Sequence, residues 1–338
     1  MGLKLLKGLE LIDRNRWIDL LNKNRYASPF QSPEYADLMN ATEGYSAEVY
    51  AVENDGVLKA LCLVTIQKES GLKAYFSKRG IVYGGPLIVE NSSEALFTLI
   101  QYIEKELKGQ SIYLEVRNFH NYSSFVEVFN EEGWDYTPYL NIQIELNGVE
   151  ISSLLANMKS NRRREIRYSE EEGATAKILN SENDLEELYD ILYDLYVNVV
   201  KLPIPRYEYF LNLYNSSIGK IIGVFHQNRL IGGAVCLFYQ NTSIYTQYYC
   251  GLRDYHKRIY PTHLAIKKAM EFGIENDLKS IDLMGAGKPG EEYGVRKYKK
   301  QFGGEVVEHG RFFKVLNPVL FKTGKMGLEI MQKFNIRI

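Results

Sequence analysis

The chain has 338 residues, of which 45% are hydrophobic and 25% are charged, and this composition excludes a disordered or fibrous protein. With 41 Lys and Arg against 42 Asp and Glu, the net charge of −1 argues against a protein that binds polyanions over its whole surface. The length predicts about two domains of ordinary size.

Cysteine usage predicts a reducing, cytoplasmic location. Cys62, Cys236 and Cys250 are too few for a disulfide framework, and none has the spacing of a metal-binding pair. We expect no signal peptide, because the N-terminus lacks an apolar core that ends in a small-residue cleavage site. We expect no membrane span, because no window approaches about 18 uninterrupted apolar residues. The one compositional outlier is aromatic, with 26 Tyr and 15 Phe but 2 Trp.

The first half of the chain predicts strands before a helix. Residues 47–67 read as two strands joined by a tight turn at Asp55-Gly56. Apolar residues at helical spacing over 95–107 then lead into a strand at 111–116.

The second half predicts the same order after two helices. A helix over 181–200 is interrupted by Leu202-Pro-Ile-Pro205, and a short helix follows at 206–214. Residues 220–240 then read as a hairpin that turns at Asn228.

A weak internal repeat links the two halves. A helix over 264–274 and a strand over 280–284 follow the second hairpin, as in the first half. The two hairpin turns are 173 residues apart and the two later strands 169 apart, which indicates duplication of one unit. The order of elements predicts an α+β (mixed α/β) fold, with a mixed central sheet flanked by helices in each of two domains, 1–150 and 151–338.

Histidines, serines and cysteines offer no recognisable catalytic or metal-binding pattern. There is no Gly-x-Ser-x-Gly elbow, and we expect no metal site. Cys62 and Cys236 fall on corresponding strands, where we expect buried small hydrophobes. We expect the scattered histidines to be surface or capping residues: His120, His226, His256, His263 and His309.

Two Gly-rich turns follow predicted strands, at 80–86 and 284–290. Neither has the spacing of a P-loop or a dinucleotide-binding fingerprint. They are typical of tight turns at strand ends, where a site in an α/β protein tends to open.

A basic segment at 159–167 carries five Lys and Arg in nine residues. On a helix these residues would present a positive stripe able to hold phosphates. Alternatively, Glu170, Glu171 and Glu172 pair with them along the helix.

The most informative segment is Gly294–Glu305, a short basic helix that ends at Gly303-Gly304. A basic helix end that satisfies the macrodipole would account for Lys and Gly. It does not account for the spacing of Tyr298, Lys299 and Phe302, which places the ammonium one turn before an aromatic anchor.

This segment resembles a known family. Tyr298-Lys299-x-x-Phe302-Gly303 is similar to the aromatic-Lys-x-x-Phe-Gly motif of FemABX-like acyltransferases, which consist of two GNAT folds in tandem. Residues 260–273 resemble the Pro-initiated helix of that family, and 280–285 its following strand. Residues 30–35 resemble its aromatic-Gln-Ser opening helix.

The resemblance implies transfer of an acyl group, often an aminoacyl group from aminoacyl-tRNA, to an amine of a cell-envelope precursor such as peptidoglycan. Related proteins with this fold use acyl-CoA as the donor, and no bound cofactor is implied. Lys299 would stabilise the oxyanion that forms when the amine attacks the acyl carbonyl. Asp282 is the candidate for a general base. The expected substrate-binding residues are Arg206, Tyr209, Tyr249, Asp282, Gly285, Gly287, Tyr298 and Phe302.

Several positions depart from the family pattern. Met39 stands where the peptidoglycan-precursor enzymes have a Lys, and Arg117-Asn118 stands where they have Asp-Pro. The Gly-rich GNAT pyrophosphate loop is absent, and the basic segment 253–258 occupies its place. The departures at Met39 and Arg117-Asn118 weaken the muramyl-peptide assignment more than the acyl-transfer assignment, and without the pyrophosphate loop acetyl-CoA cannot be assumed as the donor.

Residues 311–338 form a basic tail that carries a predicted apolar stripe. Such a tail can bind an anionic membrane surface, which would place the protein at the inner face of the membrane. Alternatively, it is a terminal helix that packs on the second domain.

Two other functions remain open from the sequence. One is an acyl-CoA-dependent acetyltransferase of polysaccharide or small-molecule metabolism. The other is a non-catalytic binding protein that has kept the fold.

Overall fold

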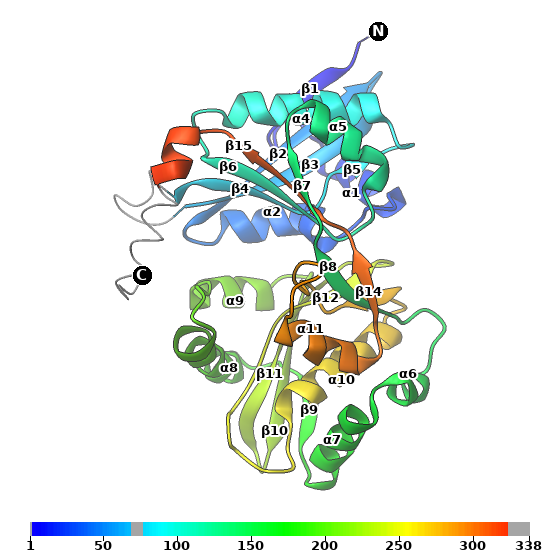
Figure 1. Cartoon of the computed structure of the whole chain (residues 1–338), viewed down its shortest axis with the longest axis vertical. Coiled ribbons are helices and arrows are strands. Elements are labelled where there is room, and N and C mark those ends of the chain that lie inside the picture. Colours follow the sequence, from blue (N-terminus) through cyan, green and yellow to red (C-terminus); the bar gives the residue numbers. More distant parts are fainter. Residues whose placement is uncertain (1, 69–76, 324–338) are drawn as a thin grey trace. The chain divides into compact units, whose positions relative to one another are not determined.

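The computed structural model describes residues 2–68 and 77–323 (Figure 1). The chain forms two compact units. The first comprises residues 1–138 together with 309–338, and the second comprises residues 139–308.

The first unit begins with a strand and alternates short helices with a sheet. Its elements are β1 (Lys4–Lys7), α1 (Arg14–Lys23), η1 (Pro29–Gln31), α2 (Pro33–Asn40), β2 (Tyr45–Asn54), β3 (Val57–Gln67), β4 (Arg79–Gly84), β5 (Leu87–Ile88), α4 (Ser93–Leu107), β6 (Tyr113–Asn118), η3 (Ser123–Phe125), α5 (Val126–Glu131), β7 (Asp135–Thr137) and β15 (Arg311–Val315).

The second unit has a closely similar succession. Its elements are β8 (Leu140–Glu145), α6 (Ile151–Asn157), α7 (Ser160–Glu171), β9 (Thr175–Ile178), α8 (Glu182–Asp194), η4 (Leu195–Val200), α9 (Tyr207–Tyr214), β10 (Gly219–His226), β11 (Arg229–Phe238), β12 (Ser243–Gly251), α10 (Pro261–Glu275), β13 (Ser280–Asp282), α11 (Gly294–Lys299), η5 (Lys300–Phe302) and β14 (Glu305–Glu308).

The two sheets share one topology, which confirms the predicted mixed α/β fold and its duplication. The strand orders are β1-β2-β3-β4-β6-β15-β7 and β9-β10-β11-β12-β13-β8-β14, and β5 pairs with β3. In each sheet an antiparallel hairpin is followed by one parallel pair, β4 with β6 or β12 with β13. A helix, α4 or α10, makes each parallel crossover, as two parallel neighbouring strands require.

The two hairpins turn in the same way. Asp55 and Gly56 have φ of 49° and 78°, and Gln227 and Asn228 have φ of 51° and 62°. Positive φ at both central residues is the type I′ geometry that matches the twist of a two-residue hairpin. The turn predicted at Asn228 is therefore present, with Gln227 as its first central residue.

Each unit takes one strand from the far side of the boundary expected between 150 and 151. Strand β8 pairs with β13 and β14 in the second sheet, and β15 pairs with β6 and β7 in the first. The units thus divide at 138/139 and 308/309 instead. The apolar alternation of β8 fits an inner strand of either sheet, so local pattern alone does not locate the boundary.

The basic tail expected at 311–338 begins as this exchanged strand and not as a helix of the second domain. Phe312 is buried and stacks on Phe129 with ring centroids 3.8 Å apart. The remainder of the predicted apolar stripe, from residue 324 onward, lies outside the described residues.

The helix predicted over 181–200 is divided. It is α-helical to Asp194 and π-helical from Leu195 to Val200, and it ends at Lys201 with φ of 56°. The two prolines that follow, Pro203 and Pro205, prevent further helix because each lacks an N–H.

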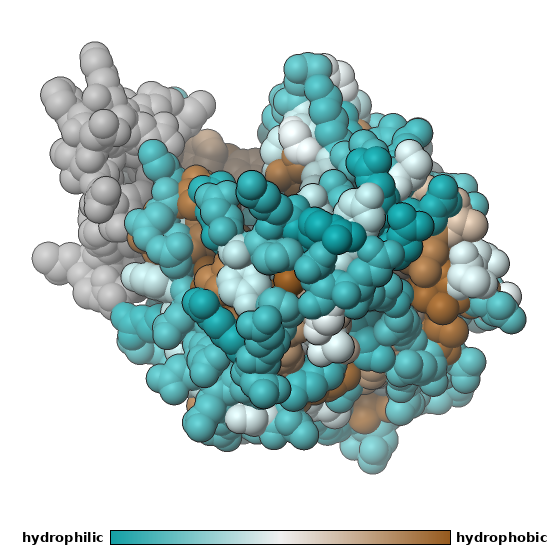
Figure 2. All heavy atoms as spheres, turned by 90° about the horizontal axis from the view of Figure 1, so that it is seen from below, coloured by the Kyte–Doolittle hydropathy of each residue, from teal (hydrophilic) through white to brown (hydrophobic). Residues whose placement is uncertain are grey.

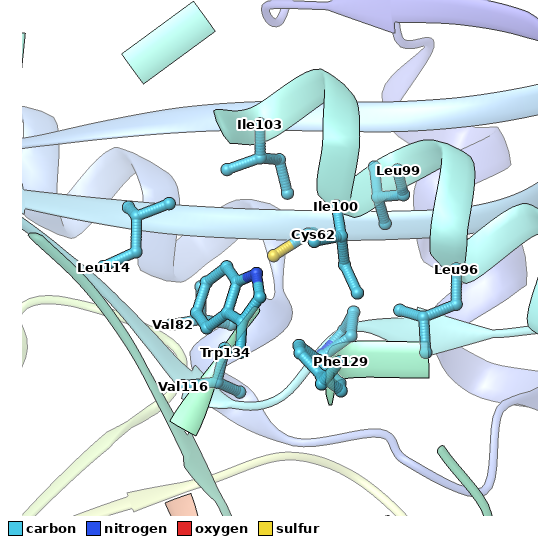
Figure 3. Close-up of a pocket in the computed structure, with 11 residues that line it drawn as sticks. Cys62, Val82, Leu96, Leu99, Ile100, Ile103, Leu114, Val116, Phe129 and Trp134 are labelled. Atoms are coloured by element: carbon cyan, nitrogen blue, oxygen red, sulfur yellow. The ribbon is translucent and has the colours of Figure 1, made fainter. Parts of the chain in front are cut away.

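The core of each unit lies between its sheet and the crossover helix. In the first unit, apolar side chains of α4 face those of β3, β4 and β6 around a void of about 20 Å³ (Figure 3). Cys62 lines this void and Cys236 lies in the core of the second unit, and burial raises the pKa of both thiols. Both are therefore small buried hydrophobes, as expected.

The surface shown in Figure 2 is mainly hydrophilic, with small hydrophobic areas between charged side chains. Among the described residues, no helix combines the length and the apolar character needed to cross a membrane.

Candidate active site

The helix that carries Lys299 is short and sharply ended. Helix α11 continues as the 3-10 turn η5, which stops at Gly303 with φ of 89°. A side chain is strained at that φ, and a Cβ would come within 2.9 Å of the Asn157 carbonyl oxygen. Glycine is therefore required where the chain turns from this helix into β14.

Lys299 is a buried cation with fixed partners. Only 6% of the residue is exposed, and its Nζ donates to the carbonyl oxygens of Met284 at 3.1 Å and Gly285 at 2.9 Å. Burial lowers the pKa of Lys299 to about 8, although the nearby Asp282 carboxylate favours the charged form. Two backbone carbonyls thus hold the ammonium in place, and the Asp282 carboxylate favours its charged form.

Asp282 is the last residue of β13 and is fully buried. Its carboxylate accepts hydrogen bonds from Asn141 Nδ2 at 3.0 Å, Gln143 Nε2 at 3.0 Å and Met284 N at 2.5 Å. Burial raises the pKa of Asp282, whereas these donors and Lys299 lower it. The carboxylate holds the start of the loop as well as facing the ammonium.

The loop between β13 and α11 is shaped by backbone contacts. Gly287 has φ of 79° and packs against Tyr293, where a Cβ would come within 2.9 Å of the ring. Arg296 donates from Nε to the carbonyl of Ala286 and from Nη2 to those of Lys288 and Glu291. The same short helix therefore fixes both Lys299 and the Gly-containing loop whose carbonyl oxygens Lys299 contacts.

The parallel strands beside this loop separate at the site. β12 pairs with β13 only from Ser243 to Tyr245, opposite Ser280 to Asp282, whereas β12 continues to Gly251. Lys299 and Asp282 lie where the pairing stops.

A second group of side chains surrounds the other face of the Lys299 helix. The rings of Tyr298 and Phe302 lie at 4.6 and 4.8 Å from the guanidinium carbon of Arg162, which is itself buried. Tyr249 stacks on Tyr298 with centroids 5.9 Å apart, and His263 contacts both rings of the Tyr298–Phe302 pair. Tyr298 and Phe302 of this aromatic group lie on the same helical turn as Lys299.

The predicted site residues fall into three groups. The group around Lys299 and the aromatic group adjoin the Lys299 helix, and the third group lies on α9. Lys299 donates to the Gly285 carbonyl and interacts electrostatically with the Asp282 carboxylate, and Gly287 belongs to the same loop. Tyr249, Tyr298 and Phe302 form the aromatic group. In the third group, Arg206 is the N-cap of α9 and Tyr209 donates to Gln247 of β12 at 2.6 Å.

The tyrosines of β12 and of the segment that follows it do not share one environment. Tyr245 is buried in the sheet, where burial raises the pKa of its phenol. Tyr255 accepts or donates a hydrogen bond with His226 Nδ1 at 2.8 Å. Of these, Tyr249 contacts the helix that carries Lys299.

The expectation that all histidines lie on the surface or at caps is wrong for His263. It is 6% exposed on α10, and burial together with Arg162 lowers its pKa to about 2, so the ring is neutral at neutral pH. His263, Ile266 and Met270 follow helical spacing along one apolar face, and that pattern could have indicated burial.

Arg162, Asn141 and Gln143 were also missed by sequence reasoning. Arg162 shares the buried face of α7 with Ile166 and Ser169. Asn141 and Gln143 alternate with apolar residues of β8, which places both amides on one face of the strand. Two amide residues two positions apart in an otherwise apolar strand could have indicated a polar site on that face.

The basic segment at 159–167 is partly neutralised. Arg167 pairs with Glu171, as expected from the helical spacing, and Arg163 donates to the carbonyl of Ala156. Glu171 and Glu172 also pair with Arg258 of the second basic segment. No cluster of His, Cys, Asp or Glu that could hold a metal ion occurs within residues 2–68 and 77–323.

Comparison with known proteins finds a family likeness for the segment that carries Lys299. The FemAB family model matches residues 214–326, which include α10, β13 and the Lys299 helix. Over that segment the chain is similar to the FemAB family. No curated protein sequence matches it.

Solved structures of FemABX-like and tandem GNAT proteins share the fold. A crystal structure of FemX matches with a TM-score of 0.73 and 14% identity, over 94% of this chain and 99% of that chain. A tandem GNAT protein from the clavulanic acid biosynthesis pathway gives 0.58 and 9%, over 94% and 99%. The C-terminal domain of a putative lysylphosphatidylglycerol synthetase from Agrobacterium fabrum gives 0.61 and 11%, over 94% and 96%. These likenesses confirm the fold, two tandem GNAT-like units.

Proposed function

We propose that this FemABX-like chain is an acyltransferase that moves an aminoacyl or acyl group to an amine of a cell-envelope precursor. The observation that carries the proposal is the buried Lys299 ammonium, held between two backbone carbonyls at the point where the parallel strands separate. The family match to residues 214–326 supports the assignment, because that segment contains the whole arrangement.

The chemistry follows from the charge that develops during acyl transfer. The acceptor nitrogen bonds to the acyl carbon, and the carbonyl oxygen becomes an oxyanion before the ester or thioester bond breaks. The leaving hydroxyl or thiol departs with the proton that the amine has lost. A cation fixed in a site of low polarity stabilises the oxyanion without reorganising, which is the role we assign to Lys299.

Asp282 contributes to this step indirectly, by its effect on Lys299. Three hydrogen-bond donors and the ammonium already surround its carboxylate, so it keeps Lys299 charged and orients the loop. We therefore propose a positioning role for Asp282 in place of the general-base role considered from the sequence. The acceptor amine is then deprotonated by solvent or by the substrate itself.

The start of α10 favours aminoacyl-tRNA over acyl-CoA as the donor. A pyrophosphate usually binds at free N–H groups of a helix N-terminus. Here the Tyr260 N–H donates to Ser169 Oγ at 2.9 Å, and Pro261 has no N–H. In the preceding basic segment, Arg258 is paired with Glu171 and Glu172.

The acceptor class rests on the family likeness, since FemX is the solved structure that matches with the TM-score of 0.73. An acceptor of this class would be met at the cytoplasmic face of the membrane, which agrees with the reducing compartment expected from the cysteines. Arg311 and Lys314 of the basic tail pair with Glu115 and Glu104, so the proposed peripheral membrane contact rests on its later basic residues, most of which lie outside the described residues.

The test is transfer from labelled donors by the full chain. Purified protein is incubated with envelope-precursor amines and either labelled aminoacyl-tRNA or labelled acetyl-CoA. We expect label in the acceptor from aminoacyl-tRNA, and a loss of roughly 100-fold or more in kcat for Lys299→Met. Lys297→Met is the matched control, because Lys297 lies on the same helix and is exposed with an ion pair to Glu292.

Transfer from acetyl-CoA alone would support the acyl-CoA-dependent acetyltransferase instead. Transfer from neither donor, with acceptor binding unchanged in Lys299→Met, would indicate a binding protein that has kept the fold. Equal rates in the two Lys variants would contradict the role of Lys299.

A further inference from the structure

Arg162 makes an unusual set of contacts for a residue in a basic helix segment. It is 4% exposed, and its guanidinium carbon packs against both the Tyr298 ring and the Phe302 ring, at 4.6 and 4.8 Å from their centroids. Tyr298 and Phe302 are one helical turn apart, so both rings face the same side of the Lys299 helix. Arginine is suited to this position because its planar group stacks on rings and donates at its edge.

The edge of the guanidinium is bound to the same turn. Arg162 Nη2 donates to Gln301 Oε1 at 3.0 Å, and the Lys159 N–H donates to the Gln301 carbonyl oxygen at 3.0 Å. The start of α7 therefore holds Gln301 by its side chain and its backbone together. Tyr298, Gln301 and Phe302 are the neighbours of Lys299 on this turn. Arg162 of α7 contacts all three, and Lys159, the N-cap of α7, also binds Gln301.

His263 and Glu165 complete the surroundings of Arg162. Nη1 contacts the imidazole nitrogens of His263 and donates to Glu165 Oε2 at 3.1 Å. His263 stacks on Tyr260 with the ring planes 3° apart. Because the imidazole is neutral, it accepts a hydrogen bond from Arg162 without adding a second positive charge.

We propose that Arg162 is a positioning residue for Lys299, which sets the depth and direction of the ammonium by clamping the turn that carries it. The inference rests on the proposed function in that Lys299 is the group that meets the reacting carbonyl. Loss of the clamp would let the helix move away from the Met284–Gly285 carbonyls, and a displacement of about 1 Å at a catalytic group can cost roughly 100-fold in rate.

The experiment compares Arg162→Lys and Arg162→Met with Arg164→Met in the full chain. Arg162→Lys keeps the charge and removes the stacking plane. Arg164 is an exposed control on the same helix, where it bonds Asn161 one turn away. The first readout is the rate at which an amine-reactive ester labels Lys299 between pH 6 and 11, followed by mass spectrometry. The second is kcat and KM for acyl transfer.

We expect the apparent pKa of Lys299 to rise from about 8 toward 10.5 in both Arg162 variants, because water reaches the ammonium once the turn loosens. Asp282 is the charged group that faces Lys299 among the described residues, and it is unchanged in every variant. We expect kcat to fall roughly 10- to 100-fold with little change in KM, and Arg164→Met to match the wild type.

The proposal is overturned if the labelling profile of Lys299 is the same in Arg162→Lys and the wild type, whatever happens to thermal stability. Labelling does not depend on the reaction. If Lys299→Met transfers acyl groups at the full rate, the proposed function fails, while the labelling profiles still decide whether Arg162 positions Lys299. If Arg162→Met does not fold, Arg162→Lys carries the comparison.

Discussion

At the scale of single residues, the Lys299 ammonium is buried with partners that replace water. Two backbone carbonyl oxygens and the Asp282 carboxylate offset part of the free energy that burial of a charge costs. The remaining cost appears as the lowered pKa, to about 8. A lysine with this pKa is still mostly protonated at neutral pH, as a cation that stabilises an oxyanion must be.

This pKa predicts how acyl transfer depends on pH. Activity should fall as the pH rises through about 8, because the neutral amine cannot stabilise the oxyanion. The measurement is kcat/KM between pH 6 and 10. In Lys299→Arg the decrease of kcat/KM above about pH 8 should disappear, even if the rate is lower. Arginine stays protonated throughout this pH range. The same decrease in Lys299→Arg would assign that titration to another group.

The candidate site could be predicted only in part at this scale. Lys299, Asp282 and Gly285 were identified from a motif, a strand end and a Gly-rich turn, all of which are local features. Arg162 and His263 were not, because each was judged by its charge and its sequence neighbours. Their burial depends on rings contributed by Tyr298 and Phe302, which are far away in the chain.

At the scale of elements, the short helix from Gly294 to Phe302 is stabilised from both ends. Arg296 binds the preceding loop, and Gly303 allows the chain to turn within contact of the Asn157 carbonyl. A helix this short is marginal by itself, so these contacts and the Arg162 clamp hold it in place.

Gly294 and Gly303, at the two ends of this helix, allow a matched comparison of Gly→Ala substitutions. Gly303→Ala should destabilise the protein by at least about 1–2 kcal/mol, because φ is 89° and a Cβ would meet Asn157. Gly294→Ala should change stability by less than about 1 kcal/mol, since nothing lies within 4 Å of its Cβ position. Urea unfolding measures both, and equal effects would contradict this account of the helix end.

The elements themselves followed closely from local patterns. Both hairpins, the crossover helices α4 and α10 and the Lys299 helix occur where periodicity and turn residues predicted them. Helix α8 differs, since its last turns are π-helical before the prolines. Apolar spacing does not distinguish an α-helix from a π segment over six residues, because the two repeats drift apart by little in that length.

At the scale of the whole molecule, the two units exchange strands. β15 follows the entire second unit in sequence yet lies between β6 and β7 of the first sheet. β8 occupies the same position between β13 and β14. The first unit therefore combines two separate stretches of chain, whereas the second unit is one continuous stretch.

This exchange predicts where a substitution near the C-terminus acts. Phe312→Ala should cost about 3–5 kcal/mol, because Phe312 is buried and stacks on Phe129. Faster hydrogen exchange should appear in β6 and β7 of the first unit, before it appears in β13 of the second. Val306→Ala is the control, since Val306 is 39% exposed on β14 and should leave both units near the wild type.

A uniform loss of protection in both units would show that they unfold together. Loss confined to the second unit would contradict the assignment of β15 to the first sheet.

The sequence by itself determined the duplicated mixed α/β unit, the positions of its main elements and the lysine at the centre of the candidate site. These features depend on periodicity, on turn residues and on contacts within a few residues, all of which can be recognised in short stretches of sequence. Only the tertiary structure decided which sheet each of β8 and β15 joins, and that Arg162 is a buried clamp instead of a surface charge. Both outcomes depend on contacts between segments more than 130 residues apart, such as Arg162 with Gln301 at a separation of 139.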